Sequence, residues 1–227
     1  LFAIIEEIRV QLGVRRLSGV LLVNDMNAGV VEMPRFSGLF GWRRYLLLGA
    51  PLLVVQSLEE VKAILAHELG HLSGQHGRVA AWSWRVRVTW SRVLESLDRR
   101  RGKVARALQQ LIHWYFDRLM CVTLVQARAQ ELVADGFAVQ VTNAPTAARA
   151  LARNAVASTV LLQHFWQPLW ERANDEPEPP VHPFSDLLMT RDEVFARPTD
   201  EVFETELARA TALDDTHPSL RERLQRM

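Results

Sequence analysis

The chain has 227 residues, of which 48% are hydrophobic and 23% are charged, and its formal net charge is +1. This length allows one domain with a sizeable core, and the balanced charge gives no reason to expect a nucleic-acid partner. The single cysteine, Cys121, excludes an internal disulfide framework.

No apolar run reaches the length of about 18 residues that a membrane-spanning helix needs. The chain also begins with Leu1 rather than with methionine. We therefore expect a fragment or a processed form of a longer protein, in which any membrane anchor would lie outside this sequence.

The first 50 residues predict one helix followed by a small sheet. Apolar side chains recur at helical spacing over residues 2–12, which indicates a short amphipathic helix. Three apolar segments follow at residues 17–23, 28–33 and 45–48, separated by a polar turn and by a loop that begins at Pro34. We expect these three strands to form a small antiparallel sheet.

The next helix is predicted to begin at a capping box. Ser57 and Glu60 have the spacing at which the serine caps the helix and the glutamate bonds back to the serine. Apolar residues then recur at helical spacing, and Gly74 and Gly77 mark the expected end of the helix.

This helix contains the pattern H-E-x-x-H. His67 and His71 are four positions apart, so that both imidazoles lie on one face and can reach one metal ion. Glu68 is next to the first histidine and can contact a water molecule in the open position of the metal without binding the metal itself. A zinc hydrolase requires such an arrangement of ligands, water and base.

A basic and aromatic helical insertion follows at residues 78–126. Its first part, 78–106, contains one lysine, eight arginines and only two acids, with tryptophans interleaved. The stretch is either a helix with a solvated basic face, which we favour, or a contact with an anionic membrane surface. Residues 108–125 are apolar but interrupted by charged side chains, which predicts a buried or lid-forming helix rather than a membrane span.

The rest of the chain is predicted to be mainly helical, which makes the fold class α+β and mainly α. The segment 174–183 interrupts the helices with three acids and four prolines, and we interpret it as a linker loop. Helical patterns cover residues 126–141, 147–166, 201–213 and 219–225.

Zinc that is held by two histidines needs a third protein ligand. The best candidate is Glu131, which lies in a mainly apolar helix one turn before Asp135. We expect Glu131 to bind the metal and Asp135 to accept a hydrogen bond from the outer ring nitrogen of His67, which would fix the tautomer of that histidine. The alternative is that the two acids belong to a solvated acidic face.

Taken together, these patterns resemble the gluzincin metallopeptidases, and in detail peptidase family M48. The resemblance covers about two thirds of the chain. It rests on residues 52–71, which lead into the H-E-x-x-H helix, and on four further motifs: Asn27-Ala28-Gly29 before a strand, Glu131-x-x-x-Asp135, Thr216-His217-Pro218, and the nearby Arg221 and Arg223.

The resemblance implies a gluzincin-type zincin fold in which the small sheet packs on the metal-binding helix. It also implies that an edge strand of this sheet binds an extended substrate by β-addition. We assign residues 28–32 to this edge, with four residues as the substrate-binding positions: Ala28, Gly29, Val30 and Val31.

The family likewise implies that His217 faces the zinc, where it would stabilise the oxyanion or occupy the fourth position in a resting form. Arg221 would support the same oxyanion or pair with Asp135. The alternative for His217 is a helix-capping role beside Pro218.

We therefore expect a single M48-like domain over residues 1–227 that binds one Zn²⁺ and acts as an endopeptidase. Its partners would be extended or unfolded polypeptides, with a membrane surface as a candidate contact through residues 78–106. Glu68 would act as general base. The alternatives are a zinc-holding, chaperone-like binding module with a closed or gated site, and a zinc hydrolase of non-peptide amides. The resemblance implies membrane association with a cytoplasmic catalytic domain, or a cytoplasmic protein.

Overall fold

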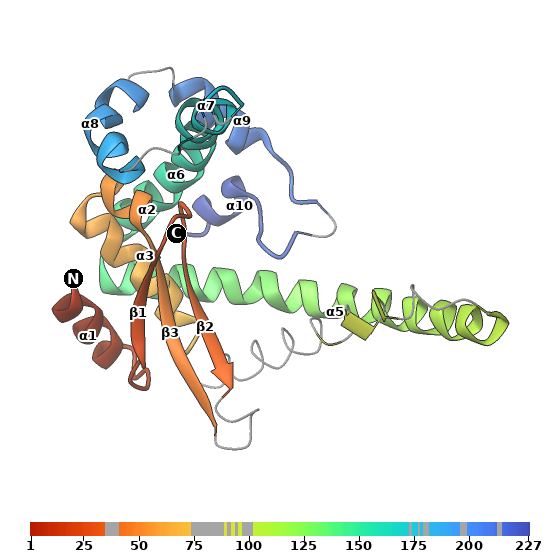
Figure 1. Ribbon diagram of the computed structural model, residues 1–227. Helices are drawn as coiled ribbons and strands as arrows, with labels where there is room; N and C mark the ends of the chain where they lie inside the picture. Colours follow the sequence, from red (N-terminus) through yellow and green to blue (C-terminus); the bar gives the residue numbers. More distant parts are fainter. Residues whose placement is uncertain are drawn as a thin grey trace.

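The structure is a computed structural model. Its small sheet and the surrounding helices form the body of the molecule, and one end of a long helix extends from this body (Figure 1). The residues that it describes are 1–34, 41–73, 89, 92–93, 95–96, 102–172, 174–176, 178, 182–195, 199–212 and 215–227.

The N-terminal part of the chain contains the sheet and the first helices. The mainly helical α+β fold class predicted from the sequence is confirmed. In chain order, the elements are α1 (Phe2–Gln11), β1 (Gly19–Val23), β2 (Ala28–Pro34), β3 (Trp42–Gly49), α2 (Ala50–Val55) and α3 (Leu58–Gly70).

The sheet is mixed, so the prediction that it is antiparallel was wrong. Its strand order is β1-β3-β2. β1 runs parallel to β3, with Gly19 opposite Tyr45, whereas β2 runs antiparallel to β3, with Ala28 opposite Leu48.

The reason is that β3 lies between two strands that are neighbours in the sequence. The connection over residues 24–27 is not a hairpin turn but passes across the end of β3 at Gly49, whose N–H donates to the carbonyl of Asn27 over 2.9 Å. A Cβ at Gly49 would overlap the carbonyl oxygen of Asp25, so this close crossing requires glycine. Polar turn residues fit a hairpin and such a crossing equally well, and the pattern alone did not distinguish them.

Helix α3 begins at the predicted capping box. The backbone N–H of Ser57 donates to the Glu60 carboxylate over 2.8 Å, and the Ser57 hydroxyl accepts from the backbone N–H of Glu60. The helix ends at Gly70, earlier than predicted, because the backbone N–H and the hydroxyl of Ser73 both donate to the Gly70 carbonyl in a tight turn. Gly74 and Gly77 lie outside the described residues.

The main core lies between the sheet, α1 and α3. Leu46 and Leu48 of β3 and Leu65 and Leu69 of α3 have no exposed surface. Burial of each leucine side chain contributes roughly 1.5–3 kcal/mol. The apolar face of α3 is thereby held against β3, while its other face is left for the helices that follow.

The regular elements in the described C-terminal part of the chain are all helices. α6 begins at Asn143, whose side chain accepts a hydrogen bond from the backbone N–H of Thr146. The elements are α5 (Lys103–Val141), α6 (Ala144–Leu161), the π-helical η2 (Leu162–Trp166), α7 (Gln167–Arg172), α8 (Pro183–Phe195), α9 (Thr199–Ala208) and α10 (Leu220–Leu224).

Most of the described residues in 108–125 are exposed and only Thr123 and Leu124 are buried, so the prediction of a buried helix was wrong. Residues 108–125 belong to α5, a single helix of 39 residues whose N-terminal half extends away from the body (Figure 1). Leu111 is 61% exposed and Val122 is 70% exposed, whereas Ala134 and Ala138 further along the helix are buried against the body. The body thus covers only the C-terminal half of α5.

Most of the basic stretch 78–106 lies outside the described residues. None of the helices in the described part of the chain is both long and apolar enough to span a membrane. Of the predicted linker loop, Asn174, Asp175, Glu176, Glu178 and His182 to Pro183 are described, and Asn174 and Asp175 form a turn after α7.

Substitution of Glu60 with alanine is expected to lower the free energy of unfolding by about 1–3 kcal/mol. The buried Glu60 carboxylate caps α3 and accepts from Arg153 over 2.8 Å, so its removal leaves two donors without their partner. Urea denaturation measures this change. Glu59→Ala is the matched control, because the exposed Glu59 forms a surface ion pair with Lys62 and should matter little. Equal losses in both variants would contradict this role of Glu60.

Candidate functional site

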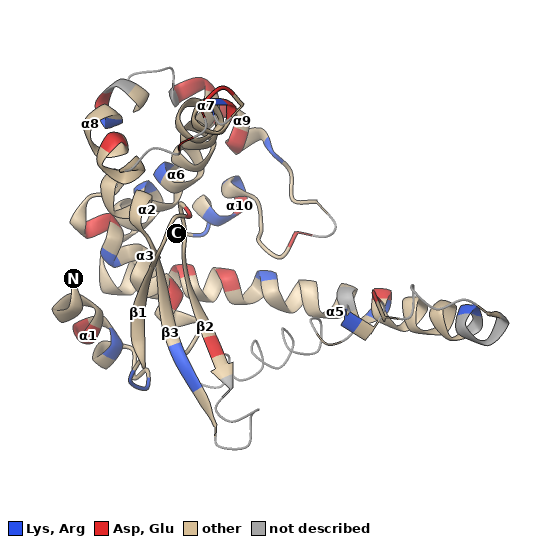
Figure 2. Cartoon of the chain, viewed as in Figure 1, with Lys and Arg blue, Asp and Glu red and all other residues tan. Residues whose placement is uncertain are grey.

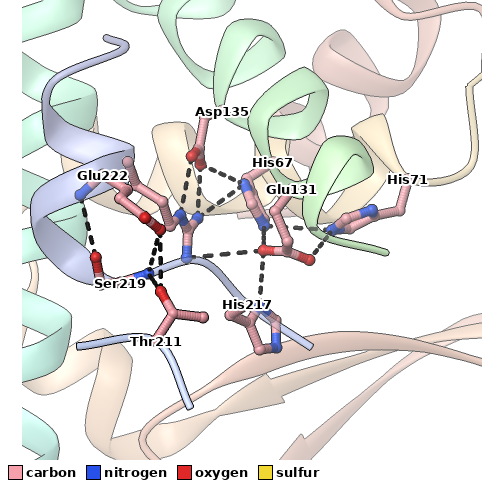
Figure 3. Close-up of polar contacts among 9 residues, drawn as sticks. His67, His71, Glu131, Asp135, Thr211, His217, Ser219 and Glu222 are labelled. Atoms are coloured by element: carbon pink, nitrogen blue, oxygen red, sulfur yellow. Dashed lines mark hydrogen bonds and ion pairs between the residues drawn. The ribbon is translucent and has the colours of Figure 1, made fainter. Parts of the chain in front are cut away.

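Helices α3 and α5 bring three metal-ligating side chains together (Figure 3). Nε2 of His67 lies 3.3 Å from Nε2 of His71 and 3.5 Å from Oε2 of Glu131. Nε2 of His71 lies 3.4 Å from Oε1 of Glu131. One ligand atom from each residue lies within 4.8 Å of the other two.

Small residues allow the two helices to approach so closely. A Cβ at Gly70 of α3 would lie 2.7 Å from the ring of Phe137 on α5. Alanines are buried on both helices, with Ala66 on α3 and Ala134 and Ala138 on α5. Larger side chains at these positions would push α5 outward and carry Glu131 away from the histidines.

The distances between these ligand atoms fit a zinc ion. With Zn–N and Zn–O bonds of about 2.0–2.2 Å, neighbouring ligands of a tetrahedral site are about 3.3–3.5 Å apart. The three distances of 3.3, 3.4 and 3.5 Å agree with this spacing. Two imidazoles and a carboxylate are also a donor set that zinc accepts.

Asp135 lies one turn beyond Glu131 and contacts the outer nitrogen of the first histidine. Its Oδ1 is 3.0 Å from Nδ1 of His67, so that this ring N–H can donate to it and Nε2 is left for a metal. Burial alone would raise the pKa of Asp135, but the hydrogen bonds from Arg223 and His67 lower it. The carboxylate therefore stays ionised.

Arg223, not Arg221, is the partner of Asp135, so the expected pairing of Arg221 was wrong. Nε and Nη2 of Arg223 donate to the two carboxylate oxygens of Asp135 over 2.9 and 2.6 Å. Arg221 is exposed and donates to the carbonyl of Leu207. Two residues that are two positions apart in a helix point in nearly opposite directions, so only one of these arginines can face α5.

His217 lies in the segment between α9 and α10 and faces Glu131 (Figure 3). Its Nδ1 is 2.7 Å from Oε2 of Glu131, and its side chain is 62% exposed. Ser219 rather than His217 caps α10, so the capping alternative was wrong. His217 thus stands at the solvent side of the three ligand atoms.

Glu68 lines a cavity of about 100 Å³ together with His67, Glu131 and His217. Burial raises the pKa of Glu68 to about 7, against the lowering effect of His67. A carboxyl group with this pKa can exchange protons near neutral pH.

The surroundings of the two histidines shift their pKa values in opposite directions. Burial alone would lower the pKa of His67, but hydrogen bonds to Asp135 and Glu131 raise it to about 9. Burial and the neighbouring His67 lower the pKa of His71 to about 4. At His67, the two carboxylates thus raise the pKa by more than desolvation lowers it, so the site favours a positive charge.

The predicted substrate-binding residues Ala28, Gly29, Val30 and Val31 lie on β2, at one edge of the sheet. One side of β2 pairs with β3, and no described strand pairs with its other side. Asn27, just before β2, lines the same cavity as Glu68. Among the described strands, the edge that β2 forms therefore begins next to the candidate metal site.

The site residues were also compared with known proteins. The model of Peptidase family M48 matches residues 36–227, which include all three ligand residues, Glu68 and His217. The match begins after β2, so it does not contain Asn27-Ala28-Gly29. No curated protein and no solved structure matched the chain. Since the match covers well over half of the chain, the protein belongs to peptidase family M48, a family of zinc metallopeptidases.

Proposed function

We propose that the protein is a zinc-dependent endopeptidase that cleaves extended or unfolded polypeptides. The observation that carries this proposal is the cluster of His67, His71 and Glu131, with the half-buried Glu68 lining the cavity beside it. One zinc ion per chain, held by these three ligands, would supply Lewis-acid activation of water and of the scissile carbonyl.

In this proposal Glu68 is the general base. It takes a proton from the attacking water and delivers a proton to the nitrogen of the leaving amine. Its raised pKa, about 7, suits both steps because the group can be deprotonated and protonated in turn near neutral pH.

Asp135 and Arg223 orient the first ligand. Asp135 holds Nδ1 of His67, and the two hydrogen bonds from Arg223 keep the Asp135 carboxylate in place. In this way α10, at the end of the chain, supports a ligand on α3.

His217 has one of two roles. It stabilises the oxyanion of the tetrahedral intermediate, or it occupies the fourth metal position in a resting form. Its contact with Glu131 and its exposed side chain are compatible with both roles. The second role would also suit the rival function, a zinc-holding, chaperone-like or binding module with a closed or gated site.

The position of β2 at an edge of the described sheet supports a peptide substrate. An extended chain can add to this edge through main-chain hydrogen bonds, which are independent of side-chain identity. Such pairing favours unfolded polypeptides over the non-peptide amides of the second rival function.

We also propose a membrane surface as a partner, through α5 and the basic stretch before it. Arg118 lies in the middle of an apolar face of α5, and its guanidinium stacks 4.4 Å from the ring centre of Trp114. Figure 2 shows the extended half of α5 as mostly uncharged, with few basic or acidic residues. The large exposed side chains of this face are Leu108, Leu111, Trp114, Tyr115, Val122 and Val125.

Aromatic, aliphatic and basic side chains on one helix face are typical of contacts with an anionic lipid interface. We accordingly propose a membrane-associated protein with its catalytic domain on the cytoplasmic side, with a cytoplasmic protein as the alternative.

Glu68→Gln is expected to retain zinc but to lower casein cleavage by about 10²–10⁴-fold, because an amide cannot accept the proton of water. Cleavage of labelled casein and zinc content by atomic spectrometry measure the two effects. Glu59→Gln, exposed near the start of the same helix, is the control. Wild-type rates in Glu68→Gln would exclude Glu68 as the base. If wild type and variant both hold zinc and neither cleaves casein, the binding-module function is favoured.

Glu131→Ala is expected to weaken zinc binding by about 100-fold or more, since even residues that only orient a ligand typically contribute 10- to 100-fold. Competition with a chromophoric chelator gives the zinc affinity. Asp117→Ala, which removes an exposed acid from the same helix, should leave the affinity unchanged. An undiminished affinity in Glu131→Ala would rule out this residue as a ligand.

Leu111→Asp combined with Val122→Asp is expected to lower binding to phosphatidylglycerol-containing vesicles by about tenfold or more, because two buried apolar contacts are lost. Vesicle co-sedimentation measures the binding. Gln110→Asp places a charge on α5 outside the apolar face and serves as the control. If all three proteins bind alike, this face does not contact the membrane.

A further inference from the structure

We infer that Arg128 is a positioning residue that holds the His217-bearing segment at the metal centre. This inference rests on the proposed function, because it assigns the orientation of His217 to a residue that contacts no substrate. Arg128 lies on α5 one turn before Glu131.

The side chain of Arg128 binds the backbone of the connection between α9 and α10. Its Nε donates to the carbonyl of Asp215 over 3.0 Å, and its Nη2 donates to the carbonyl of Ala212 over 2.6 Å. The planar guanidinium can hold two acceptors at once in a fixed geometry, which a lysine cannot do. Asp215 is two residues before His217, so the attachment is close to the residue that it places.

The described residues of this connection have no helix or strand, and a few side-chain bonds hold them. Asp215 accepts from the backbone N–H of Ala212 over 2.7 Å, which closes a local turn. Thr211 accepts from the backbone N–H of Ser219 over 2.8 Å and donates to Glu222 over 2.9 Å (Figure 3). These bonds tie the connection to itself and to α10, whereas those of Arg128 tie it to the helix that carries Glu131.

His217 depends on such an attachment because its own side chain is mostly exposed. The side chain is 62% exposed, and its Nδ1 contacts Oε2 of Glu131. Glu131 and Arg128 lie on one face of the same rigid helix, three residues apart. Helix α5 therefore sets both ends of the contact: it carries the carboxylate and it anchors the segment that brings the imidazole.

Loss of Arg128 should therefore act through His217. In zinc-loaded protein, Arg128→Ala is expected to lower kcat/KM for a peptide by roughly 10- to 100-fold, the range that misplacement by about 1 Å causes. In a His217→Ala background, the same substitution should change kcat/KM by less than about twofold, since residues that act as one unit are not additive. Arg128→Lys should recover part of this loss in kcat/KM. As the control, Arg149→Ala removes an exposed arginine of α6 and should leave kcat/KM unchanged.

A second measurement does not need activity. Hydrogen exchange of the backbone amides of Ala212 and Ser219 should be at least about tenfold faster in Arg128→Ala than in the wild type, because the segment is released. The exchange of α3 amides should not change, which separates release of the segment from general unfolding.

Each outcome decides the inference. Independent, multiplicative effects of Arg128→Ala and His217→Ala on kcat/KM would overturn it, and so would unchanged exchange at Ala212 and Ser219. If the wild-type protein cleaves no peptide, the proposed function fails, whereas the exchange experiment still tests whether Arg128 holds the segment.

Discussion

The candidate site depends on the close contact between α3 and α5. Gly70 meets the ring of Phe137, and buried alanines on both helices leave room for this close contact. His67 on α3 and His71 at its C-terminal cap can therefore meet a carboxylate from α5 at the distances of a metal site. Since packed interiors transmit small changes in volume, the spacing of the three candidate ligands depends on these small residues.

The candidate site also depends on the compensation of its buried charges. Glu131 and Asp135 are 6% and 4% exposed, and buried carboxylates are stable only when they are paired or bind a metal. Arg223 supplies one compensating charge from α10, and the histidines can supply another when they are protonated. A zinc ion would satisfy the same requirement, so the electrostatics that would bind the metal also favour the docking of the C-terminal helix.

The structure separates a rigid centre from a more open surface. The candidate metal ligands lie on α3, at its C-terminal cap and on α5, whereas His217 comes from an irregular segment and is largely exposed. The extended half of α5 is more exposed still, and it carries its apolar residues on the outside. Chemistry would thus take place on the rigid helices, and contacts with substrate and membrane on elements that the core holds less tightly.

Local patterns were sufficient for the features that lie within one element. The capping box of α3, the spacing of His67 and His71, and the pair Glu131 and Asp135 follow from helical periodicity, which the sequence displays directly. Contacts between distant segments were decided only by tertiary structure. They include the insertion of β3 between β1 and β2, the choice of Arg223 over Arg221, and the bonds from Arg128 to Asp215. The reason is physical: a pattern indicates which face of an element is apolar, but not which other element will cover it.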